Sequence, residues 1–312
     1  MRFFLWAILV LFVFMLGFVP FNQKKDLVIK AKYENVFNQV LKPLNWKNWQ
    51  QDVKAAWQHD STQVNITAKG TNAAIEAPDL HIETRLNGFG LAVEKSIKKR
   101  NEHYSFTLQI DKNFKHTDIH LTAKTNGFKW LMLRLNTKSI FTDLEALKQY
   151  LEDDKAYYGF QINDLSTVDT NILVVKKTVP LKNKNSAIVA AQNHLQAYIS
   201  LHHYDVAQPV IADIHADYSG DSVRIMMGIP IVQSPKPAGD VVLMQMPKQN
   251  RQISIIYTGK YGNRLACYNS LKRYIADHSL ATPEVPYEKY LDNKIPLNNN
   301  DYTRMQIIFP VQ

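Results

Sequence analysis

The chain has 312 residues, a length that accommodates about two globular units. Hydrophobic residues make up 46% and charged residues 21% of the sequence, a balance that excludes a disordered chain. The net charge of +9 comes from basic residues scattered among acidic ones, so we expect no direct nucleic-acid binding. A single cysteine, Cys267, excludes an internal disulfide and a cysteine-rich metal site.

The N-terminal segment is apolar. Residues 3–19 carry no charge and have about the minimum length of a helix that spans a bilayer. A cleaved signal peptide is the alternative, but no small-residue cleavage site follows the run. We therefore expect residues 1–21 to be a single-pass transmembrane anchor at a bacterial inner membrane. Basic residues on both sides of the run leave its orientation open, and we expect the periplasm to hold the remaining domains.

Residues 25–155 begin with a strand and a helix and then change period. Apolar and polar residues afterwards alternate in several segments, which predicts antiparallel strands with one buried face. The sequence Thr142-Asp143-Leu144-Glu145 is a capping box that predicts the start of a helix covering the sheet. The alternating segments are 64–68, 80–86, 104–110 and 119–123.

This order of strand, helix, meander and helix, with the turn Trp46-x-x-Trp49, resembles the START-like helix-grip fold of the polyketide-cyclase and SRPBCC families. The resemblance implies a pocket between a curved sheet and a C-terminal helix. Two tryptophans in a turn also fit plain core packing, and this alternative stays open. His116 and His120 are about 13 Å apart along a strand, too far to share a metal ion, so we expect no metal site.

Residues 158–312 repeat one order of elements. Each half reads as strand, helix, strand and strand, with a period of about 75 residues. We therefore expect a duplicated βαββ unit with a shared antiparallel sheet, and an α+β fold class for the chain. The first copy comprises 171–181, 187–204, 210–218 and 223–231, and the second comprises 241–258, 263–278, 285–291 and 303–311.

Two segments of the second copy, Ile255–Tyr261 (IIYTGKY) and Pro286–Leu291 (PYEKYL), resemble the gyrase-inhibitor-like (GyrI-like) effector-binding domains of bacterial transcription activators. The resemblance implies one glutamate on the floor of an aromatic pocket, where it attracts cationic groups of hydrophobic ligands. By motif position this glutamate is Glu288, although an outward-facing glutamate on an edge strand is the alternative. The candidate ligand-binding residues are Glu288, Tyr290, Tyr257, Tyr261, Tyr218 and Met226.

The sequence contains none of the common catalytic or nucleotide-binding motifs. We therefore expect a membrane-anchored protein that binds a small hydrophobic or cationic ligand, needs no cofactor and has no DNA-binding domain of its own. One alternative is a hydrolase acting on reactive small molecules through the pocket glutamate and a tyrosine, as the resemblance allows. The other is a membrane-tethered scaffold for protein interactions.

Overall fold

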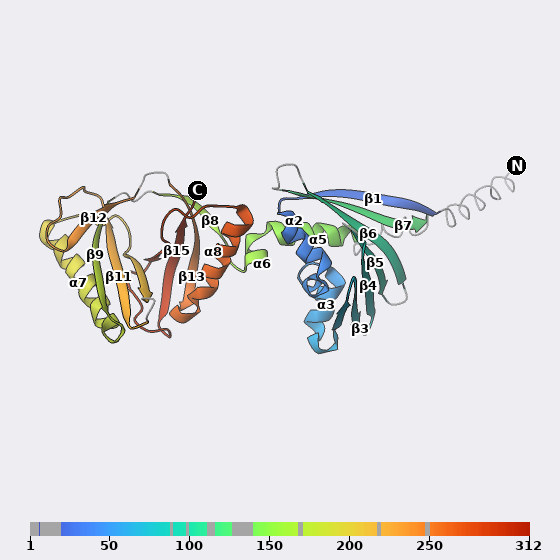
Figure 1. The fold of residues 1–312 in the computed structure, drawn as a ribbon, viewed down its shortest axis with the longest axis horizontal. Coiled ribbons are helices and arrows are strands. Elements are labelled where there is room, and N and C mark those ends of the chain that lie inside the picture. The colour runs from blue at the N-terminus through green and yellow to red at the C-terminus, as the bar shows by residue number, and fades with distance from the viewer. Residues whose placement is uncertain are drawn as a thin grey trace. The chain divides into compact units, whose positions relative to one another are not determined.

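The computed structural model describes residue 6 and residues 20–87, 90–97, 100–110, 116–126, 140–167, 171–216, 220–246 and 250–312 (Figure 1). The chain divides into two compact units, Met1–Tyr157 and Tyr158–Gln312. Each unit has an antiparallel sheet with helices, which confirms the predicted α+β class. The predicted domain bounds, 25–155 and 158–312, stay predictions.

The predicted single-pass anchor and its inner-membrane localisation are contradicted. Within the part of the chain that the structure describes, no helix is long and apolar enough to cross a bilayer. A span needs about 20 apolar helical residues, and strand β1 already begins at Pro20, so a helix cannot continue past that point. The greater part of the apolar run, residues 7–19, lies outside the described residues.

The first unit is built on a seven-stranded sheet, counted over the described residues, with the strand order β1-β7-β6-β5-β4-β3-β2. Its strands are β1 (Pro20–Ile29), β2 (Asn65–Lys69), β3 (Asn72–Ala77), β4 (Leu80–Asn87), β5 (Gly90–Ile97), β6 (Arg100–Ile110) and β7 (Thr117–Asn126). Its helical segments are α2 (Tyr33–Leu41), η1 (Pro43–Asn48), α3 (Gln51–His59), η2 (Ser61–Gln63) and α5 (Ile140–Glu152), and α6 (Asp154–Tyr158) follows. The predicted alternation is present in β4, where Ile82 and Thr84 are buried between exposed residues.

Trp46 and Trp49 belong to the core of the first unit. Their side chains are 0% and 2% exposed, and their ring centroids lie 5.1 Å apart. Both indole N–H groups donate to backbone carbonyls of α2, that of Trp46 to Val40 at 2.7 Å and that of Trp49 to Gln39 at 3.2 Å. Buried tryptophans with bonded N–H groups fix packing, so the core-packing alternative describes this pair.

The predicted capping box does not begin helix α5, because the helix already includes Ile140. Its Asp143 is buried and accepts hydrogen bonds from Gln50 Nε2 at 2.9 Å and from the backbone N–H of Gln51 at 3.2 Å. Gln50 Oε1 in turn accepts from the N–H of Val53 at 2.7 Å and so caps α3. Asp143 therefore ties α5 to the start of α3.

We expect Gln50→Ala to lower the free energy of unfolding of the first unit by about 2 kcal/mol, because α3 loses its cap and buried Asp143 loses a donor. All five tryptophans lie within residues 1–157, so their fluorescence during urea unfolding reports this unit alone. The matched control is Gln149→Ala, a change at an exposed position of α5 that leaves these bonds intact. Equal losses in the two variants would contradict the prediction.

The second unit contains the predicted duplication. The first copy consists of β9 (Asn171–Pro180), η3 (Leu181–Asn183), α7 (Lys184–His202), β10 (Ile211–Ala216) and β11 (Ser222–Ile231). The second copy consists of β13 (Arg251–Lys260), η4 (Tyr261–Arg264), α8 (Leu265–His278), β14 (Tyr287–Tyr290) and β15 (Tyr302–Pro310). Two more strands, β8 (Asn163–Ser166) and β12 (Val241–Gln245), form the sheet edges.

The sheet order β12-β9-β11-β10-β14-β15-β13-β8 is symmetric about the junction of β10 and β14, where the two copies meet. Two residue pairs make this seam, Ile211 with Lys289 and Ala212 with Glu288. Helix α7 packs against β9 and β11, and α8 packs against β13 and β15 (Figure 1). The duplication therefore places Glu288 in the middle of the sheet and not on an edge strand.

Candidate functional site

Glu288 is buried at the seam, with 5% of its surface exposed. Successive side chains of a strand point to opposite faces. Glu288 and Tyr290 therefore share the face that α8 covers, and Tyr287 points to the other face. The outward orientation that the sequence left open is not found.

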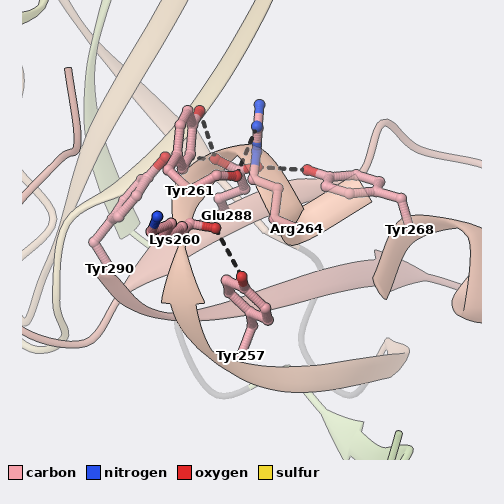
Figure 2. Close-up of polar contacts among 7 residues, drawn as sticks. All are labelled: Tyr257, Lys260, Tyr261, Arg264, Tyr268, Glu288 and Tyr290. Carbon is pink, nitrogen blue, oxygen red and sulfur yellow. Dashed lines mark hydrogen bonds and ion pairs between the residues drawn. The ribbon is translucent and has the colours of Figure 1, made fainter. Parts of the chain in front are cut away.

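The carboxylate of Glu288 accepts four hydrogen bonds (Figure 2). Its Oε1 accepts from Arg264 Nε at 2.7 Å and from the hydroxyl of Tyr268 at 3.0 Å. Its Oε2 accepts from the hydroxyl of Tyr261 at 3.3 Å and from that of Tyr290. Each oxygen thus has two donors, which offsets the cost of burying the charge.

The turn between β13 and α8 positions these donors. Tyr261 and Arg264 lie in η4, and Tyr268 lies in the first turn of α8. The guanidinium of Arg264 stacks over the ring of Tyr261, with Cζ 3.6 Å from the ring centroid, and its Nη1 donates to the carbonyl of Tyr261 at 3.2 Å. These contacts hold Arg264 against the carboxylate.

The tyrosines of the site are hydrogen-bond donors and not bases. Burial, followed by the charge of Glu288, raises the pKa of Tyr261 to about 12. The same two causes raise the pKa of Tyr268 and of Tyr290 above that of an ordinary tyrosine. All three hydroxyls therefore keep their protons at neutral pH.

The structure brings together three of the six predicted site residues, Glu288, Tyr261 and Tyr290. Tyr257 stands apart, because its hydroxyl donates to the carbonyl of Lys260 at 2.7 Å (Figure 2). Met226 lines a cavity that Glu288 does not line. Tyr218 lies outside the described residues.

The sequence reasoning missed Arg264 and Tyr268. Their spacing held a signal, because Arg264 follows Tyr261 by three residues and Tyr268 follows Arg264 by four. Residues three and four apart share a helix face, so a basic and an aromatic side chain at the start of the predicted helix had to lie close to Tyr261. This spacing did not show that Arg264 and Tyr268 would face the strand that carries Glu288.

Glu288 opens onto a cavity of about 200 Å³. Arg264, Tyr268 and Lys272 line it, together with Ala212 and its neighbours on β10. Across the described residues, no group of three or more His, Cys, Asp or Glu side chains is placed to hold a metal ion.

Lys184, the first residue of α7, is half-buried and interacts electrostatically with Arg264 and Glu288. Burial and the charge of Arg264 lower the pKa of Lys184, and the charge of Glu288 opposes them. Glu288 is ion-paired with Arg264, so Lys184 adds a positive charge beside this pair.

No family model and no curated protein matches the sequence. Among solved structures, the C-terminal domain of EcmrR is 14% identical, with 49% of this chain and 98% of that chain covered and a TM-score of 0.40. A hydrolase from Listeria innocua is 10% identical, with 49% and 92% covered and a TM-score of 0.36. A START superfamily protein from Mycobacterium smegmatis is 10% identical, with 42% and 97% covered and a TM-score of 0.30. These are likenesses of fold, and the function rests on the site.

We expect the second unit to lose stability as the pH rises from 10 to 12. Tyr261 has a pKa of about 12 when folded and 10.0 as an ordinary tyrosine, so above pH 10 the unfolded chain binds fewer protons than the folded chain. Each pH unit in this window costs about 1.4 kcal/mol for such a tyrosine. The stabilisation is fully present below pH 10 and is lost towards pH 12.

Calorimetric unfolding at several pH values measures this dependence. Tyr261→Phe removes one of three hydroxyls with raised pKa values, so the profile between pH 10 and 12 should become less steep by about 1.4 kcal/mol per pH unit. Tyr302→Phe is the control, because Tyr302 is 74% exposed. Profiles of equal slope in Tyr261→Phe and the unchanged chain would contradict the assignment.

Proposed function

We propose that the second unit binds a small molecule in the cavity at Glu288, and that the ligand carries an anionic group such as a carboxylate or a phosphate. The carboxylate of Glu288 is fully occupied by four donors, whereas two cations beside it have unused donors. Arg264 uses Nε and Nη1, and its Nη2 has no partner within the described residues.

The second cation, Lys184, also favours an anionic ligand. Its ammonium has no hydrogen-bond or ion-pair partner among the residues that the structure describes, and it is repelled by Arg264. It begins α7, a helix without acidic residues in its first turn and without a side-chain cap. Because the amino end of a helix is electropositive, an anion placed between Lys184 and Arg264 would relieve the repulsion of the two cations.

A preference for cationic ligands, which the resemblance implies, has weaker support. Such a ligand would compete with Arg264, which is held by its ion pair to Glu288 and by its stacking on Tyr261. The hydrolase alternative has weak support as well. It needs a group that can take a proton, and here the carboxylate oxygens are bonded and the tyrosines stay protonated. A binding module is therefore the function that this geometry favours.

Thermal shift of the full chain tests the proposal, because a ligand that binds the folded state raises the unfolding midpoint. The panel contains short carboxylates, phosphate monoesters, lipophilic cations and neutral compounds. We expect anions to raise the midpoint of the second unit, which is distinguished from the first by its lack of tryptophan. Lys184→Gln should weaken the best anion about tenfold, since a charge-assisted contact is lost.

The matched control is Lys182→Gln, the same change at an exposed residue of η3. A shift caused by cations, lost in Glu288→Gln and retained in Lys184→Gln, would establish the opposite polarity. Absence of a shift with every compound would refute ligand binding at this cavity.

A further inference from the structure

The face of the second sheet opposite Glu288 has a hydrophobic cluster of its own. Its buried members are Ile172, Val174, Ile211, Tyr287 and Ile308, and Met226, Met244 and Met246 pack against them half-buried. The cluster contains no residue of α7 or α8, so the helices do not cover it. Apolar surfaces of this kind commonly mark sites where a ligand or another molecule binds.

A cavity of about 440 Å³ lies over this cluster. Its floor is at Gly228, where a Cβ would come within 2.6 Å of Ile172 and 3.3 Å of Ile211. At one side Tyr287 donates to Met246 Sδ at 3.8 Å. The volume falls in the range of about 300 to 1,000 Å³ typical of small-molecule sites, and methionines adapt well to flexible apolar ligands.

The cavity continues into a second one of about 400 Å³, because Asp213, Met226 and Val285 line both. The second cavity is basic, with Lys176, Lys177 and Arg224 in its lining. Lys176 is the register partner of Met226, so the two side chains stand next to each other on the same face.

The charges of the second cavity favour an anion. The side chains of Lys176 and Arg224 stand on this face, whereas that of the adjacent Lys177 points to the opposite face. The carboxylate of Asp213 in the same lining already interacts within the chain. The combined surface therefore runs along the strands from an apolar end at Met244 to a cationic end at Arg224.

We propose that this face is a second binding site, for a linear amphiphile with an anionic head group. The hydrocarbon chain lies over the methionine-lined cavity, and the head group lies beside Lys176 and Arg224. This site is separate from the cavity at Glu288 and does not depend on it, because β14 directs Tyr287 to one site and Glu288 to the other.

Calorimetric titration of the full chain with straight-chain carboxylates from butanoate to dodecanoate, below their micelle concentrations, tests the proposal. We expect the affinity to rise about fourfold for each added methylene until the apolar cavity is filled. Met226→Gln, a change of similar shape at the junction, should reduce this increment. The double variant Lys176→Glu with Arg224→Glu should bind carboxylates about tenfold more weakly and alkylammonium ions of equal length more tightly.

The control is Lys182→Glu with Lys236→Glu, an equal change of charge at exposed positions outside both cavities. The increase in affinity per methylene reports the apolar cavity alone, because neither Glu288 nor Lys184 lines it. Lys184→Gln should therefore lower the affinity for carboxylates of every length at the Glu288 cavity and leave this increment unchanged, which separates the two sites. The proposal is overturned by affinity that ignores chain length, by equal binding of carboxylates and alkylammonium ions to the unchanged chain, or by equal loss in the double variant and its control. It is also overturned if sedimentation shows that a second copy of the chain covers this face.

Discussion

The buried carboxylate of Glu288 is the constraint around which the second unit is organised. A carboxylate with 5% exposure is tolerated only where its oxygens are fully bonded, and here a cation and three hydroxyls supply the bonds. The donors come from the turn after β13, from α8 and from β14 itself. The network therefore fixes α8 relative to the seam where the two copies of the βαββ unit meet.

The same strand separates two chemically different surfaces. Glu288 lines a small cavity beside α8, and Tyr287 lines a larger apolar cavity on the side without helices. This division follows from the two-residue period of a strand. Neighbouring residues of β14 thus face two cavities of different chemistry, and Ala212 and Asp213 of β10 line both of them.

The first unit uses a buried polar contact in a different way. Asp143 joins α5 to the start of α3 through Gln50 and Gln51, and Trp46 and Trp49 fill the core. These groups are bonded to each other or to backbone carbonyls, so they define the packing of helices and offer little to a ligand. The polar groups of the second unit differ, because Arg264 and Tyr268, which bind Glu288, also line a cavity.

The two sheets and the duplication could be predicted from the sequence, because strand and helix periods are local properties of the chain. The motif that carries Glu288 was found through the resemblance to effector-binding domains. It also suggested the neighbours Tyr261 and Tyr290, which belong to the same motifs. The sequence did not predict that Arg264 and Tyr268 bind Glu288, nor that Met226 lies on the opposite face of the sheet. The apolar N-terminal run misled because composition indicates a membrane span and does not show where a helix ends. The charge that the site prefers in a ligand depends on which side chains of η4 and α8 contact Glu288 of β14. Contacts between segments so far apart in the chain are set by the packing of the helix on the sheet, and no local sequence pattern predicts them.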